Sequence, residues 1–280
     1  MATTTARARP PVATPRRMQP PSEFAWTIFA LIFTIIFVHA TYVSWIRPQG
    51  AEDTAAVQTK LRTDKEYVPT STIFLRIKDI EQETEIGHFM WAMLILGYKA
   101  YLVRRERKLL ERELIHVPEG IKVLPEDAKD YARQIEALPP EDQPKLVVRA
   151  LQRTLDRFAA TRSIRDSAET SSSVCDSEAE RLDSGLAMIR YIAWAIPAIG
   201  FIGTVRHIGD ALQQANKAVT GDITGVTSDL GIAFNATFVA LFLTIILMFF
   251  LHQLQQAQEK LVHDTDHWID QHLIRHMQVR

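Results

Sequence analysis

Four long blocks of apolar residues dominate the chain, and they constrain its fold more than any other feature. They lie at 24–46, 86–103, 191–205 and 230–251. The first block has no acidic or basic residue, and at about 1.5 Å per residue it spans about 34 Å, enough to cross a bilayer core. Because backbone groups in a bilayer need internal partners, such blocks fold as helices. We therefore expect an all-α, polytopic helical membrane protein with four transmembrane helices and a helical cytoplasmic extension.

The blocks divide the chain into spans and connecting segments. We expect transmembrane helices at 23–46, 86–103, 187–208 and 229–251. The other parts are a disordered tail at 1–22, loops at 47–85 and 209–228, a helical region at 104–186 and a helical tail at 252–280. Within 104–186, the Ser-rich stretch 163–176 is interpreted as a polar connector. A signal peptide is a weaker interpretation of the first block, because the block is too long and no small-x-small cleavage site follows it.

The distribution of basic residues predicts the orientation, because loops rich in Lys and Arg stay in the cytoplasm. Four arginines lie in 1–22 and five basic residues in 104–112, whereas the link 207–229 carries only Lys217. Both termini are therefore expected in the cytoplasm, with the loops 47–85 and 209–228 in the periplasm. The six Lys and Arg residues of 47–85 argue against this orientation.

Composition excludes several functions. A net charge of −1 disfavours a general nucleic-acid binder, which needs a basic face. With one cysteine, Cys175, the chain forms neither an intrachain disulfide nor a Cys-based metal site. We find no P-loop, nucleophile elbow, HExxH or dinucleotide-binding motif, so we expect no enzyme activity and no cofactor. The histidine pairs His263/His267 and His272/His276 have metal-binding spacing, but on an exposed helix they are interpreted as surface polar residues.

Small residues distinguish the third and fourth spans from the first two. We expect close helix packing, which small side chains permit in lipid, at Pro197, Gly200, Gly203, Ala233, Ala236, Ala240 and Thr244. The hydroxyl groups of Thr204, Thr237 and Thr244 have two interpretations. They bond to the carbonyl one turn back as part of the packing, or they form a polar seam along a pore or a partner helix.

Neither of these two spans carries Asp, Glu, Lys or His in its middle. A proton relay at membrane depth needs an ionisable group. If the protein conducts protons, the titrating group is therefore expected to come from a second polypeptide. Thr204 and Thr237 would then only hydrogen-bond to that group or to water.

Two motifs carry a family resemblance. The stretch 194–205, WAIPAIGFIGTV, is followed on the next span by 230–242, LGIAFNATFVALF. The pair resembles the signature of the MotA/TolQ/ExbB proton channel family, in which Pro and G-x-x-G-T-V end one span and a Gly-Ile…Ala-Thr pattern begins the next. The resemblance covers 182–252. In one departure, His207 stands where the family often has Gly, so we expect the outer turn to differ.

The resemblance implies a ring-forming stator subunit of a proton-driven motor complex in the bacterial inner membrane. It implies a homo-oligomer, taken to be a pentamer, around a dimer of a MotB/TolR/ExbD-like single-span protein with one membrane Asp. The family's pore-facing threonines fall on Thr204 and Thr237, and Ala236 favours H+ over Na+. A non-conducting membrane scaffold is the alternative, and a substrate transporter is disfavoured because no inverted repeat is visible. The sequence does not identify the machine that is driven.

Overall fold

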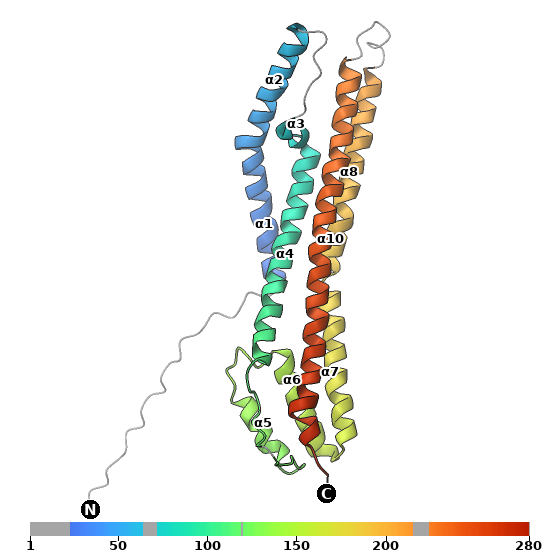
Figure 1. Cartoon of the computed structure of the whole chain (residues 1–280). Coiled ribbons are helices and arrows are strands. Elements are labelled where there is room, and N and C mark those ends of the chain that lie inside the picture. The colour runs from blue at the N-terminus through green and yellow to red at the C-terminus, as the bar shows by residue number, and fades with distance from the viewer. Residues whose placement is uncertain (1–22, 64–71, 119, 215–223, 280) are drawn as a thin grey trace, which may run out of the picture.

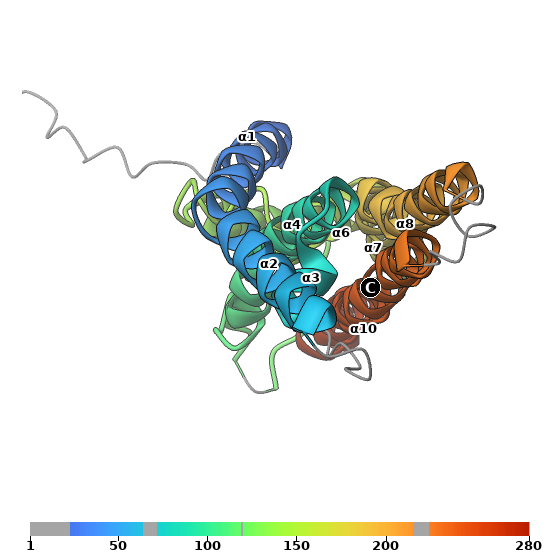
Figure 2. The same ribbon diagram turned by 90° about the horizontal axis from the view of Figure 1, so that it is seen from above.

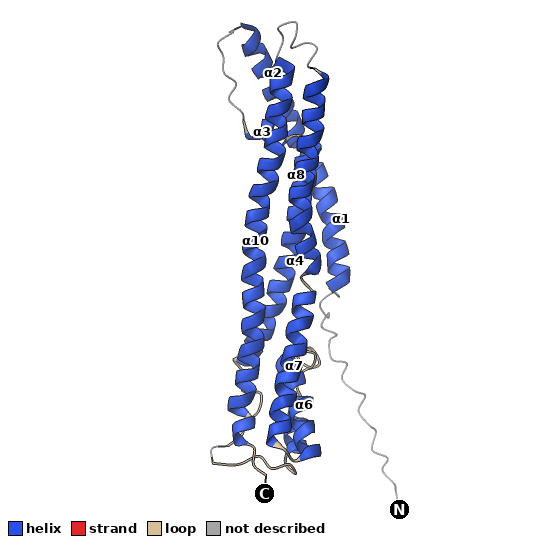
Figure 3. Cartoon of the chain, turned by 90° about the vertical axis from the view of Figure 1, so that its right-hand side faces the viewer, coloured by secondary structure: helices blue, strands red, loops and turns tan. Residues whose placement is uncertain are grey.

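The computed structural model describes residues 23–63, 72–118, 120–214 and 224–279, and it is an elongated bundle of helices (Figures 1 and 3). The elements are α1 (Glu23–Thr41), the π-helical turn η1 (Tyr42–Ile46), α2 (Arg47–Thr63), α3 (Ile73–Ile77), α4 (Ile80–Leu110), α5 (Ala128–Glu136), α6 (Leu146–Thr161), α7 (Ile164–Ser184), α8 (Ala187–Gln213), α10 (Thr224–His272) and the 3-10 turn η2 (Ile274–His276). The described residues contain no strand, which confirms the all-α prediction. The tail 1–22 and Lys217 lie outside the described residues.

Four helical segments are long and apolar enough to cross a membrane, as the sequence predicts. They are Glu23–Val57, Ile80–Leu110, Ile164–Gln213 and Gly225–His276. Seen along the bundle, α4, α8 and α10 lie together, and α1 lies against the side of α4 (Figure 2). A buried apolar cluster joins α4, α8 and α10 along much of their length. The chain is therefore a membrane protein built around a three-helix core.

Helices replace three expected loops. The segment 47–85 begins with α2, which continues α1 through η1 without a break. Pro48 has no N–H to donate, and the chain widens to a π turn just before it, where Arg47 donates to the carbonyl of Tyr42. The link 209–228 is shorter than expected, because α8 ends at Gln213 and α10 begins at Thr224. The stretch 163–176 is part of α7 and not a connector.

Two glycines bring α8 close to its neighbours. A Cβ atom at Gly200 would lie 2.6 Å from the Cβ of Ala240, and one at Gly203 would lie 2.7 Å from the Cγ of Glu81. Real Cβ atoms essentially never approach so closely. Ala233, Ala236 and Ala240 of α10 are buried, whereas Pro197 and Thr244 are half-buried. These small residues therefore pack the helices of the chain against each other.

Replacing Gly200 by Ala tests this packing, and Gly209 provides the control. A Cβ at Gly209, on the same helix, would meet no atom within 4 Å. Overpacking costs about 1–3 kcal/mol, so Gly200→Ala should lower the melting temperature of the purified protein, while Gly209→Ala should not. Adding Ala240→Gly to Gly200→Ala should recover part of the loss. Equal melting temperatures for the two glycine variants would contradict the close approach.

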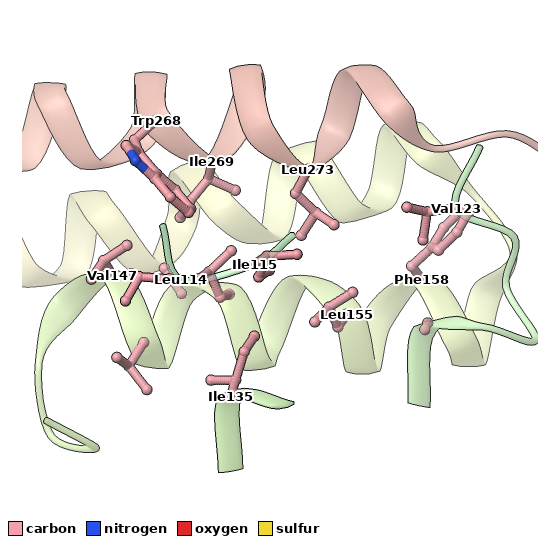
Figure 4. Packing of buried hydrophobic residues seen from close by; sticks show 14 of the residues in the cluster. Leu114, Ile115, Val123, Ile135, Val147, Leu155, Phe158, Trp268, Ile269 and Leu273 are labelled. Carbon is pink, nitrogen blue, oxygen red and sulfur yellow. The ribbon is translucent and has the colours of Figure 1, made fainter. Parts of the chain in front are cut away.

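A second core lies where α4 and α10 leave the apolar region. Side chains from α5, α6, the segment between α4 and α5, and the end of α10 interdigitate there (Figure 4). The main chain closes the same region, because Val123 donates to the carbonyl of His276 at 2.8 Å and Gln278 donates to the carbonyl of Val123 at 3.0 Å. We call this unit, residues 109–184 with 264–279, the helical extension.

Helix α7 connects the extension to α8, and its buried face is polar. Ser167, Ser171, Cys175 and Glu178 are buried at helical spacing. The Glu178 carboxylate accepts hydrogen bonds from Arg149 of α6 at 2.6 Å and from Arg181 at 2.6 Å. Small side chains allow α7 to pack closely, and the two arginines provide donors to both oxygens of the buried Glu178 carboxylate.

Cys175 is only 2% exposed, so its thiol should react slowly in the native protein. We expect a water-soluble maleimide to label the native protein only after denaturation, because the reagent must reach the sulfur. A Ser177→Cys substitution in a Cys175→Ala background places a thiol on the exposed face of the same helix and should react at once. If native Cys175 reacted as fast as Cys at 177, the packing of α7 would be wrong.

Candidate functional site

The two threonines singled out from the sequence meet between α8 and α10. The Oγ1 atoms of Thr204 and Thr237 lie 2.5 Å apart. Thr204 Oγ1 also lies 2.9 Å from the carbonyl oxygen of Ala233 and 3.1 Å from that of Gly200. Thr237 Oγ1 lies 3.4 Å from the Gly200 carbonyl oxygen. The hydroxyl pair therefore ties the two helices together at the level of their closest approach.

The pair keeps hydrogen-bonding capacity beyond these contacts. A hydroxyl has one proton to donate and two lone pairs that accept. The two hydroxyl protons have three possible acceptors: the carbonyl oxygens of Gly200 and Ala233 and the oxygen of the other threonine. Each threonine can therefore change its hydrogen-bond partner. Both side chains are half-buried, and a group outside the subunit can therefore reach them.

The surface around the pair is apolar. Phe201 and Val205 of α8 and Phe234 and Phe238 of α10 are more than half exposed. The hydroxyl pair is thus a small polar spot on a face that otherwise suits lipid or an apolar helix. By contrast, Thr244 donates only to the carbonyl of Ala240, one turn back, at 2.8 Å.

A third helix adds carboxyl groups that the sequence analysis missed. Glu81, Gln82 and Glu85 of α4 are buried. The Oε1 atom of Glu85 lies 3.2 Å from the position that a Cβ at Gly200 would take. From sequence, these residues are expected in a loop that ends at residue 85, just before the apolar run. Their spacing within one helical turn is the signal that could have located them on a helix face.

His207, where the family often has Gly, belongs to an ion cluster at the end of α8. The guanidinium of Arg206 lies 2.8 Å from Glu81 Oε1, and the Nε2 atom of His207 lies 3.8 Å from Glu81 Oε2. The imidazole is buried, and its Nδ1 atom lies 4.0 Å from Asp210. We call Glu81, Arg206 and His207 the Glu81 cluster.

The other candidate residues take part in packing. The rings of His263 and His267 stack, and His272 stacks on Trp268 and bonds to its carbonyl. Within the residues that the structure describes, no three His, Cys, Asp or Glu side chains gather as a metal site. The basic stretch 104–112 pairs with the extension, for example Arg105 with Glu141 and Arg107 with Asp264, each at 3.7 Å.

Comparison with known proteins gives one result. The model of the MotA/TolQ/ExbB proton channel family matches residues 141–267, and no curated protein or solved structure matches. The match begins before α6, continues through α7 and α8, and ends near the end of α10. It contains both threonines and extends beyond the stretch 182–252 that carries the resemblance. Residues 141–267, which build the α8–α10 pair and its hydroxyl contact, are therefore similar to the MotA/TolQ/ExbB proton channel family.

Proposed function

We propose that the chain is the ring-forming stator subunit of a proton-driven motor complex. The observation that carries the proposal is the Thr204–Thr237 pair, half-exposed within an apolar face on the two helices that match a proton channel family. Neither helix has a carboxyl group in its middle, so the group that moves past the pair belongs to a partner. The partner is a MotB/TolR/ExbD-like single-span protein whose membrane segment carries an Asp.

The hydroxyl pair would alter the proton affinity of that Asp. A carboxyl group among apolar side chains stays neutral, because desolvation penalises its charged form. A hydroxyl that donates to the carboxylate stabilises the charged form by about 1.5–3 kcal/mol, which is a factor of about 10–100 in proton affinity. Thr237 can turn its proton from Gly200 or Thr204 toward the partner, while Thr204 keeps its bond to Ala233. The Asp would release its proton beside the pair and regain it elsewhere.

Such a cycle needs several subunits around the partner. We infer a homo-oligomer, taken to be a pentamer, that surrounds a partner dimer and covers the exposed aromatic side chains beside the threonines. The complex lies in the bacterial inner membrane with both termini and the helical extension in the cytoplasm. H+ is the proposed ion. Ala236 is fully buried beside Gly203 and offers no side-chain oxygen as a ligand to Na+.

A non-conducting scaffold is the alternative. The bonds from Thr204 to two carbonyl groups favour it, because they explain a threonine at this position by packing alone. The two functions predict different proton fluxes when the Thr237 hydroxyl is replaced by a methyl group of similar volume.

Thr237→Val tests the proposed role, with Thr244→Val as the matched control. The Thr237 substitution keeps the shape but removes the hydroxyl, so proton flux into liposomes containing chain and partner should fall about 10–100-fold while the complex stays assembled. Thr237→Ser should retain part of the flux. Thr204→Val should give a smaller loss. Thr244→Val should conduct like the wild type, because its hydroxyl bonds only within its own helix.

Wild-type flux from Thr237→Val would favour the scaffold and identify the hydroxyl as packing. Co-purification provides a second criterion. The proposal expects the chain to bring down a small single-span protein with a membrane Asp, and a wild-type monomer in the presence of that protein would contradict it.

The orientation has its own test. In the Cys175→Ala background, two single-cysteine variants test the orientation. Ser177→Cys changes an exposed position of α7, and Glu52→Cys changes an exposed position of α2, at the other end of the bundle. In intact spheroplasts, an impermeant maleimide should label Cys at 52 but label Cys at 177 only after the membrane is opened. The reverse pattern would place the extension outside the cytoplasm.

A further inference from the structure

One turn of α4 holds polar side chains that are buried and unpaired. Gln82 and Glu85 are each 0% exposed. Neither side-chain oxygen of Glu85 and neither polar atom of the Gln82 amide has a hydrogen-bond partner among the described residues. Buried polar groups in proteins are almost always hydrogen-bonded, so this exception requires a physical explanation.

The Glu85 carboxyl group lies beside the candidate site. Glu85 Oε1 lies 3.2 Å from the position of a Cβ at Gly200. The Gly200 carbonyl oxygen is the atom that both threonine hydroxyls approach. Helix α8 therefore separates the hydroxyl pair from the Glu85 carboxyl group by a single glycine residue.

Charged and titratable groups face Glu85 mainly from one end. Glu81 lies one turn earlier on α4, and Arg206 and His207 of α8 face Glu81. From η1, the buried hydroxyl of Tyr42 interacts electrostatically with Glu85 and is unpaired among the described residues. The parts of α8 and α10 nearest to Gly200 contribute Ala240 and backbone, and no charge. Polar groups thus extend inward from the Glu81 cluster through Gln82 and end at Glu85.

Because the Glu85 carboxyl group is buried without a hydrogen-bond partner among the described residues, its neutral, protonated form is favoured. An ionised carboxylate in an apolar interior costs far more than a neutral one, and Arg206 is already paired with Glu81. The neutral form needs a proton, which the exposed end of the bundle supplies. Gln82 both donates and accepts hydrogen bonds, so water can link its amide to Glu81 and Glu85.

We propose that Glu85 is a proton-binding site within the subunit, loaded from the Glu81 cluster through Gln82. This inference rests on the proposed function and adds a second carboxyl group to it, on the chain itself. On loading, an O–H bond forms at Glu85 and one breaks at the donor, a hydronium ion or protonated Glu81. With hydronium as the donor, its positive charge and the negative charge of the Glu85 carboxylate cancel and water is released. With protonated Glu81 as the donor, the negative charge moves from Glu85 to Glu81, where Arg206 balances it. Because Glu85 adjoins Gly200, its charge state alters the field at the Thr204–Thr237 pair.

Infrared spectroscopy of the full-length chain in lipid tests the site without any flux assay. At neutral pH the wild type should show the carbonyl absorption of a neutral carboxylic acid, which shifts in D2O. Glu85→Gln should remove it, while Glu83→Gln should leave it unchanged. Glu83 lies on the same turn but pairs with Arg47 of α2 and His39 of α1. If Glu85→Gln does not fold, 13C-labelled glutamate in the wild type should shift the same absorption.

No such absorption in the wild type, or one that persists in Glu85→Gln, would overturn the proposal. The flux assay adds the functional test. Glu85→Gln should reduce proton flux at least tenfold, and Gln82→Met, which keeps the shape without the amide, should slow it as well. Flux lost in Thr237→Val but unchanged in Glu85→Gln would refute a role for this site while leaving the proposed function intact. The absorption present in a wild type that conducts no protons would support the site and refute the proposed function.

Discussion

The close approach of α8 to α10 and α4 at Gly200 and Gly203 is the constraint on which the rest of the structure depends. In lipid there is little hydrophobic drive to hold helices together, and packing and hydrogen bonds take its place. The two glycines remove the side chains that would keep the helices apart. Only because of this approach do the two threonine hydroxyls meet, and only because of it does α4 bury Glu81 and Glu85 against α8.

The site and the helical extension are mechanically continuous. α10 runs from Thr224 to His272 as one helix, about 70 Å long at 1.5 Å per residue, and its end is part of the core of the extension. α8 is joined to α7 by a turn at Gly185 and Leu186, and α7 packs on α6 with an ion pair between half-buried Arg149 and buried Glu178. A shift of α8 against α10 at the threonines would therefore reach the extension through two rigid connections.

The sequence predicted the four spans and the helical region 104–186, but it missed α2 and the start of α7, for a physical reason. Apolar length locates membrane helices, so all four spans were found, and the small residues located the packed pair. α2 and the stretch 163–176 of α7 were missed because they carry few large apolar residues, as at Ser167 and Ser171 of α7. Glu85 was missed because the expected span, 86–103, was set to begin just after the last acidic residue. Only the packed structure shows that its helix starts earlier and that its carboxyl group faces a glycine.

The central claim is that the Thr204–Thr237 seam faces a partner helix. A structure of the complex, extracted with its native lipids and solved by electron cryomicroscopy, tests this most directly. The account predicts several copies of the chain around central helices of a second protein, with Thr237 of each copy directed inward and a partner Asp within reach of at least one. A complex in which the seam faces lipid, or in which no second protein occupies the centre, would contradict it.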